Sequence, residues 1–192
     1  MPGRTLVVAL VLAWGGAAAA ADADGNFVIK GAGTATCATL QKAKAARDER
    51  YASIAGWLDG YLSAQNELRG ATFDLAPWQQ TELLLAAVAG WCKSRPQDTL
   101  HTAVFRLIET LQTGRLTERS AMLEVGDDAA RVVVYAAIWQ RVQQRLKLRG
   151  FYDGEVTGAA DAPTRKALRA FQAERKLPTT GLPDQQTLAL LL

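Results

Sequence analysis

The sequence predicts an all-α protein built from two small helical domains. Three observations support this fold class: apolar residues recur at helical spacing in the first half, two cysteines lie in that half, and one turn-and-cap motif occurs twice near the C-terminus. We expect a disulfide-linked helical bundle over residues 30–113, a linker over 114–130 and a three-helix domain over 131–192. About 170 residues follow residue 21, which is enough for two small domains.

Residues 1–21 have the features of a secretory signal peptide. Arg4 supplies a positive charge, residues 6–14 are apolar but too few to span a bilayer, and an Ala19-x-Ala21 cleavage site follows. A retained membrane anchor is the alternative, and the two glycines after the apolar run argue against it. We therefore expect a secreted protein with no membrane segment after cleavage of the signal peptide, and the resemblance of the first domain described below places it in the periplasm.

Cys37 and Cys92 are the only cysteines of the chain. In an oxidising compartment such a pair favours one disulfide, and two buried free thiols are the alternative. A bridge of this span would remove about 4 kcal/mol of entropy from the unfolded state in the simple chain model. We expect no metal site, because His101 is the only histidine and no CxxC or HxxxH spacing occurs.

Apolar spacing predicts three helices in the first domain, over residues 49–68, 78–91 and 99–111. The stretch 114–130 is polar and without strong periodicity, so we interpret it as the linker. We expect the next helix to begin near residues 126–128. Its inward residues recur every four positions and are Val134, Ile138, Val142 and Leu146.

The pattern T-G-x-x-D-x-x-T occurs at residues 157–164 and again at 180–187. Glycine permits the turn, aspartate can cap the following helix, and threonine three positions later can bond back to the cap. We therefore interpret Asp161 and Asp184 as helix caps. A paired general acid and base is the alternative, and the helix-start spacing already explains both residues without it.

A set of spaced residues in the C-terminal part of the chain follows the pattern of a known family. They are Val142, Gln143 and Leu146, then Gly150, Phe151, Tyr152, Asp153, Gly154, Val156 and Gly158, then Thr164, Arg165, Ala167, Leu168, Phe171 and Gln172, and finally Leu177, Pro178, Gly181, Thr187 and Leu188. At these positions the chain from about residue 131 resembles the peptidoglycan-binding domain type 1. Asp161 departs from the pattern, because the family often has glycine there, and it is compatible as a helix cap. The resemblance implies a three-helix fold and attachment to bacterial cell wall.

The candidate peptidoglycan-binding residues are Phe151, Tyr152, Asp153, Arg165 and Gln172. The two aromatic rings beside Asp153 suit a sugar or a stem peptide, Arg165 suits peptide carboxylates, and Gln172 can offer amide hydrogen bonds. A structural alternative stays open for the same residues. In it Phe151 packs in the core and Gln172 ties down a loop.

A second, shorter pattern lies in the first domain. It comprises Cys37, Trp57, Leu58, Gly60, Tyr61, Asn66, Trp91, Cys92, Pro96, Leu100 and Ala103. With these residues the domain resembles a small secreted family that includes HdeA-type acid-stress periplasmic chaperones and immunity proteins against secreted amidase effectors. The resemblance implies that the two cysteines bridge helices. It does not choose between a chaperone, an inhibitor and an adaptor.

The sequence gives no argument for catalysis or for a cofactor. The single histidine cannot assemble the zinc ligands of a wall amidase, and no nucleophile motif surrounds it. The net charge of +3 gives no case for nucleic acid. We expect a non-catalytic protein that binds peptidoglycan and anchors an N-terminal interaction domain, which in turn binds a periplasmic protein. The alternative is a periplasmic chaperone or immunity-type inhibitor whose C-terminal module is a protein-binding adaptor.

Overall fold

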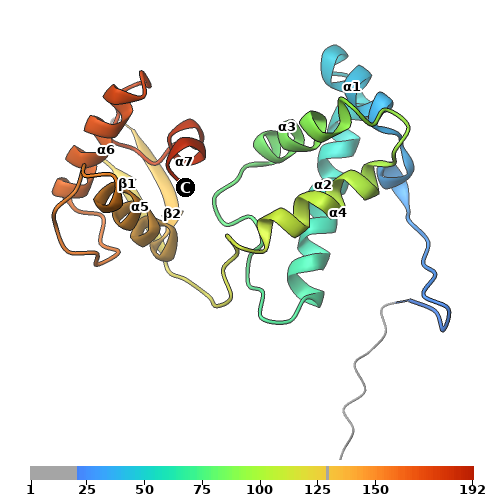
Figure 1. Cartoon of the computed structure of the whole chain (residues 1–192), viewed down its shortest axis with the longest axis horizontal. Helices are drawn as coiled ribbons and strands as arrows, with labels where there is room; N and C mark the ends of the chain where they lie inside the picture. The colour runs from blue at the N-terminus through green and yellow to red at the C-terminus, as the bar shows by residue number, and fades with distance from the viewer. Residues whose placement is uncertain (1–20, 129) are drawn as a thin grey trace, which may run out of the picture.

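The computed structural model describes residues 21–128 and 130–192. In these ranges the chain forms a 3-10 turn η1 (Gly31–Thr34), seven α-helices and one two-stranded sheet. Figure 1 shows two lobes, the first drawn in blue to green and the second in orange to red. The predicted mostly helical fold with a disulfide-linked first domain is confirmed. The predicted signal peptide lies outside the described residues, apart from its last residue.

The first domain packs four helices around one apolar core: α1 (Cys37–Ala46), α2 (Glu49–Leu68), α3 (Thr81–Cys92) and α4 (Leu100–Leu111). The bounds of α2 and α4 agree with the predicted helices within one residue. Helix α3 begins three residues later than predicted, because the chain around Pro77 is not helical and Gln80 is the N-cap. Helix α1 was not predicted, and Thr36 caps it by accepting a hydrogen bond from the amide of Thr39.

The predicted disulfide between Cys37 and Cys92 is present and buried. It joins the first turn of α1 to the last turn of α3. Backbone hydrogen bonds support the same corner, because Cys37 N donates to Asp98 O at 2.8 Å and Leu100 N donates to Ala35 O at 2.8 Å. Covalent and hydrogen bonds together therefore fix α1 against both α3 and the start of α4.

The stretch predicted as a linker instead contains part of a β-hairpin. Strand β1 (Met122–Gly126) pairs antiparallel with β2 (Arg131–Tyr135), and Val125 and Val134 point into the second core. The helix expected from residues 126–128 therefore begins only at Ala136. The physical reason is the run of three valines and a tyrosine in β2, since β-branched and aromatic residues favour a strand over a helix.

The second domain packs three helices and the hairpin around the second core, which confirms the predicted three-helix arrangement. The helices are α5 (Ala136–Leu148), α6 (Ala162–Glu174) and α7 (Gln185–Leu191). Trp139 and Phe171 are its largest fully buried side chains. Leu116 also belongs to this core, so the second folding unit begins before the hairpin.

Direct contacts join the two domains. Trp78, in the loop between α2 and α3, packs against the second core. Gln185 at the start of α7 binds the same loop through both ends of its amide: its Nε2 donates to Trp78 O, and its Oε1 accepts from Gln80 N at 2.8 Å. Arg141 on α5 donates to the carbonyls of Gly114 and Arg115 after α4. The domains are therefore held at a defined interface.

Replacing both cysteines, as Cys37→Ala with Cys92→Ala, should destabilise the first domain selectively. The bridge closes a span of 55 residues, and its loss should lower the free energy of unfolding by about 4 kcal/mol. Hydrogen exchange followed by mass spectrometry should show faster exchange in α1 to α4 and unchanged protection in α5 to α7. Equal loss of protection in both domains would contradict two separate cores.

Candidate functional site

A buried glutamine closes each copy of the repeated motif. Gln143 Oε1 accepts from Gly158 N at 2.8 Å, and its Nε2 donates to Thr164 Oγ1 at 3.0 Å. In the second copy, Gln172 Oε1 accepts from Gly181 N at 2.8 Å and its Nε2 donates to Thr187 Oγ1 at 2.9 Å. Both glutamines and both threonines are fully buried. We call these two arrangements the glutamine locks.

The aspartates of the repeat are helix caps, as predicted. Asp161 Oδ1 accepts from Thr164 N at 2.7 Å at the start of α6, and Asp184 Oδ1 accepts from Thr187 N at 2.8 Å at the start of α7. The threonine amide makes the cap bond in each case. The hydroxyl turns to the glutamine instead, which the motif alone did not indicate.

Three of the five candidate binding residues have structural contacts. The Gln172 amide is used within the second lock. Tyr152 is only 7% exposed, and its hydroxyl donates to Glu155 O at 2.9 Å. Phe151 is half-buried with its ring edge-on to Phe171, at 5.6 Å between centroids. These contacts favour the structural alternative for all three residues.

The other two candidates lie in different surroundings. Arg165 contacts the turn of the hairpin, where Nη1 donates to Gly126 O at 3.3 Å and Nη2 pairs with Asp127 at 3.2 Å. Asp153 is exposed in the loop between α5 and α6. In the described ranges no hydrogen bond, ion pair or ring contact joins any two of these five residues, and a binding role for them stays a prediction.

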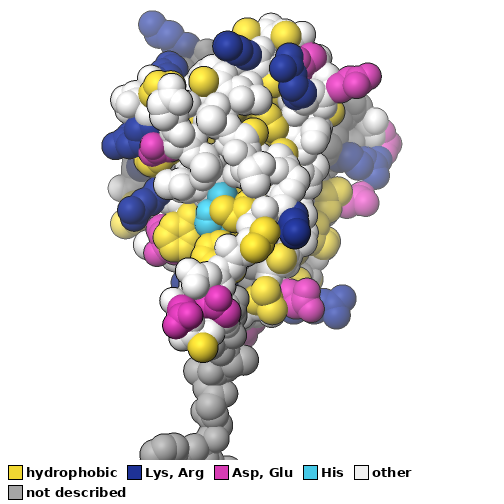
Figure 2. Space-filling model, turned by 90° about the vertical axis from the view of Figure 1, so that its right-hand side faces the viewer, with side chains coloured by type: hydrophobic (Ala, Val, Ile, Leu, Met, Phe, Trp, Pro, Cys, Tyr) yellow, Lys and Arg dark blue, Asp and Glu magenta, His cyan; other side chains and the backbone are white. Residues whose placement is uncertain are grey.

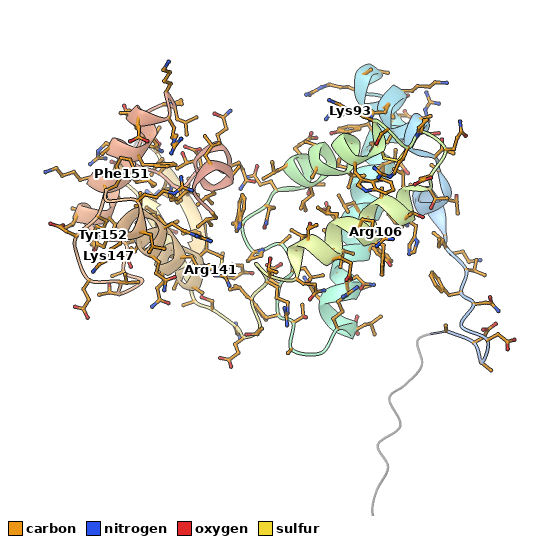
Figure 3. The ribbon with its side chains drawn as sticks, viewed as in Figure 1. Lys93, Arg106, Arg141, Lys147, Phe151 and Tyr152 are labelled. Atoms are coloured by element: carbon orange, nitrogen blue, oxygen red, sulfur yellow. A yellow bond between two sulfur atoms is a disulfide. The ribbon has the colours of Figure 1, made fainter. Side chains whose placement is uncertain are left out.

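A cleft of about 550 Å³ lies where the two domains meet. Helix α5 lines it with residues at spacings of three and four, which share one face of the helix. These are Arg141, Gln144, Arg145 and Leu148. Leu192 after α7 also lines the cleft, and the remaining lining residues come from the loop before α3 and from the end of α4 and the residues after it: Trp78, Gln79, Thr110, Leu111, Thr113 and Gly114. Figure 3 places Arg141 on the side of the second domain that faces the first, whereas Phe151 and Tyr152 lie farther from it. We call this cavity the interdomain cleft.

The sequence reasoning missed the interdomain cleft, because half of its lining comes from the other domain. The only sign in the sequence was the polar face of α5. Burial lowers the pKa of Arg141, and its guanidinium is used for the two bonds to the carbonyls of Gly114 and Arg115 after α4.

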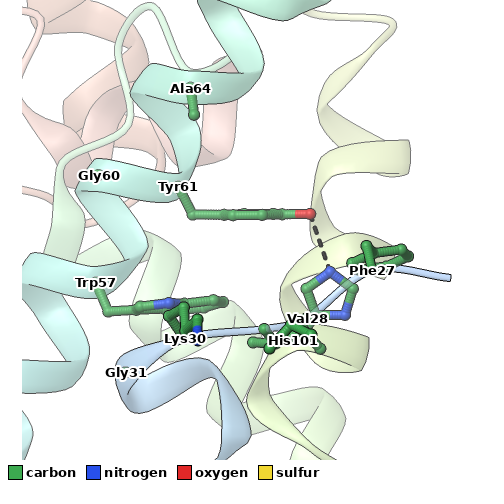
Figure 4. Close-up of a pocket in the computed structure, with 10 residues that line it drawn as sticks. Phe27, Val28, Lys30, Gly31, Trp57, Gly60, Tyr61, Ala64 and His101 are labelled. Atoms are coloured by element: carbon green, nitrogen blue, oxygen red, sulfur yellow. Dashed lines mark hydrogen bonds between the residues drawn. The ribbon is translucent and has the colours of Figure 1, made fainter. Parts of the chain in front are cut away.

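The first domain has a separate cavity of about 460 Å³, whose lining includes the rings of Phe27, Trp57, Tyr61 and His101. Trp57 and Tyr61, one turn apart on α2, stack with ring centroids 5.2 Å apart. The hydroxyl of Tyr61 and Nε2 of His101 lie 3.0 Å apart in a hydrogen bond, and Phe27 packs edge-on to the imidazole. Figure 4 shows these side chains around the cavity, and Figure 2 shows hydrophobic groups gathered around the histidine on this face. We call it the aromatic cavity.

Trp57 lies against the backbone of η1 because Gly33 leaves space for it. A Cβ on Gly33 would lie 2.2 Å from the indole ring, so only glycine fits there. Trp57 is partly buried against the first core, and it also lines the cavity.

Two further features of the described residues bear on function. In the ranges 21–128 and 130–192, no group of three or more His, Cys, Asp or Glu side chains is arranged to hold a metal ion. None of the helices in the same ranges is both long enough and apolar enough to cross a membrane.

Comparison with known protein families identifies the second domain. Residues 136–191 match the family of the putative peptidoglycan binding domain, which confirms the C-terminal resemblance. The match covers α5 to α7 and both glutamine locks. Neither the curated proteins nor the solved structures contain a significant match to the chain. The resemblance of the first domain to the HdeA-type chaperones and amidase immunity proteins is not confirmed.

Replacing Gln172 with leucine should destabilise the second domain. The change leaves Gly181 N–H and the Thr187 hydroxyl without this partner in a buried site, and each such group costs about 1–3 kcal/mol. We expect a loss of roughly 3 kcal/mol in urea unfolding monitored by circular dichroism. Gln186→Leu is the matched control, because Gln186 is exposed on α7. Equal stability of the two variants would contradict the lock.

The first domain should lose stability as the pH falls below about 6.5. Burial lowers the pKa of His101 from its ordinary value of 6.5, so the unfolded chain binds this proton more readily than the folded one. The decline should occur between 6.5 and the lowered value and then level off. Urea unfolding at pH 7.5 and pH 5 measures it, and His101→Gln should remove that part of the decline. An unchanged pH dependence in the variant would refute this assignment.

Proposed function

We propose that this protein is a non-catalytic, exported peptidoglycan-binding protein that anchors its helical first domain to the cell wall. The observation that carries the proposal is the match of residues 136–191 to the putative peptidoglycan binding domain family. The fold agrees with it, because the matched residues form three helices with their own core. The domain therefore has the architecture that the family match requires.

The charge of the second domain supports binding to an anionic wall. From residue 136 to 192 the sequence has nine Lys and Arg residues but five Asp and Glu residues. Four of the cations lie on or directly after α5: Arg141, Arg145, Lys147 and Arg149. Such an excess attracts the carboxylates of peptidoglycan, and salt should weaken the attraction.

The disulfide and the peptidoglycan-binding domain are both consistent with a location outside the cytoplasm. Periplasmic residence is the more specific part of the proposal. Export rests on the apolar N-terminal segment with its Ala19-x-Ala21 site, and the choice of the periplasm rests on the likeness of the first domain to periplasmic proteins.

The proposed role of the first domain is to bind another molecule, a periplasmic protein in our interpretation. The aromatic cavity supports this role, because it offers apolar surface beside the polar Tyr61–His101 pair. The non-catalytic assignment rests on the surroundings of His101. Its Nε2 forms a hydrogen bond with the Tyr61 hydroxyl, and its ring packs near Phe27 and Phe105. A general base would instead be oriented toward a nucleophile.

The purified protein should co-sediment with purified sacculi, and residues 114–192 should do so as well. The fragment starts at 114 because Leu116 and β1 belong to the second core. Raising the salt from about 0.1 M to about 1 M should reduce the bound fraction several-fold, because the Debye length falls from about 10 Å to about 3 Å.

The cysteine-containing fragment 22–113 is the control and should stay in solution. Failure of the full-length protein to sediment would overturn the proposal, and the alternative of a chaperone or inhibitor with a protein-binding adaptor would take its place.

A further inference from the structure

We infer that the interdomain cleft binds the anionic stem peptide of peptidoglycan, with Arg145 as the residue that pairs with its carboxylate. The inference rests on the proposed wall-binding function and assigns it a site. That site differs from the five candidate residues expected from the sequence, and the first domain forms part of it.

The charges of the interdomain cleft favour an anion. Among the lining side chains, those of Arg141 and Arg145 are cationic and none is acidic, while Leu192 brings the main-chain carboxylate at the end of the given sequence. Arg141 is occupied by backbone carbonyls. The Arg145 guanidinium makes no hydrogen bond or ion pair with any of the described residues. A guanidinium can bind a carboxylate through two parallel hydrogen bonds, so Arg145 is the free cation of this cleft.

The apolar part of the cleft suits the aliphatic portions of a peptide. Leu148 follows Arg145 by one turn of α5 and is 78% exposed. Trp78 and Leu111 face it from the first domain. A peptide of small residues could place its side chains against this surface while its carboxylate meets Arg145.

The polar groups of the cleft can bind a peptide backbone. The hydroxyls of Thr110 and Thr113 donate to the carbonyls of Leu107 and Thr110 within the chain, so their oxygens are free to accept from a peptide N–H. The amide of Gln144 is exposed beside them and offers both a donor and an acceptor.

Size and shape favour the peptide over the glycan strand. A volume of about 550 Å³ is that of a small-molecule site. A sugar ring would require an aromatic face open to solvent, whereas Trp78 is partly buried against the second core. The carboxylate of the peptide can form an ion pair with the free Arg145 guanidinium, whereas a neutral sugar cannot.

The test measures binding of soluble muropeptides, released from sacculi by a muramidase, to the full-length protein by isothermal titration calorimetry. Arg145→Glu should weaken binding at least tenfold, and Arg145→Lys should weaken it less, because the charge remains but the paired hydrogen bonds do not. Lys166→Glu is the matched control, since Lys166 is exposed on α6, lies outside the cleft and undergoes the same change of charge. It should bind as the original protein does. Muropeptides with amidated carboxylates should bind at least tenfold more weakly than untreated ones.

Sacculus sedimentation of the same proteins separates this inference from the proposed function. If the original protein and Arg145→Glu sediment equally and bind muropeptides equally, the cleft assignment is wrong and wall binding stands. If Lys166→Glu loses as much affinity as Arg145→Glu, general charge explains the binding and the cleft assignment is again wrong. If the original protein binds neither sacculi nor muropeptides, both proposals fail.

Discussion

The two glutamine locks are the constraint on which the second domain depends. Each lock uses one buried amide to hold a glycine turn through its oxygen and a threonine at a helix start through its nitrogen. Because both glutamines are excluded from water, these bonds are the means by which the buried amides are satisfied. The two glycine turns set the directions of α6 and α7. Gln185, at the start of α7, binds the first domain. The interdomain cleft therefore depends on bonds made by residues that do not line it themselves.

The sequence predicted the local features of the fold well. The periodicity gave α2 and α4 almost to the residue, and the repeat gave both aspartate caps, because these features depend on neighbours within a few positions. The hairpin was not predicted, because Val134 lies four residues before Ile138 and therefore also fits a helical spacing. The pairing of β2 with β1, which the local spacing does not show, gives Val134 a strand conformation. Helix α1 was not predicted, because most of its apolar residues are alanines, which give a weak hydrophobic periodicity.

The candidate site was harder to predict for a physical reason. Aromatic and amide residues such as Tyr152 and Gln172 have the chemistry for binding a ligand, but the same chemistry satisfies a buried loop. Only burial separates the two roles, and the sequence does not report burial directly. The interdomain cleft combines α5 with the end of α4 and the Trp78 loop, and no spacing along the chain relates these segments.

Helix α4 links the two cavities of the protein. His101 near its start lines the aromatic cavity, and Thr110 and Leu111 near its end line the interdomain cleft. Thr110 lies nine positions after His101, which is a distance of about 14 Å along the helix axis at 1.5 Å per residue. The histidine is visible on the face of the first domain that points away from the second domain (Figure 2). A molecule in the aromatic cavity would thus leave the cleft open, so the proposed partner and the proposed wall peptide would not compete for the same surface. Anchoring then raises the local concentration of that partner at the wall.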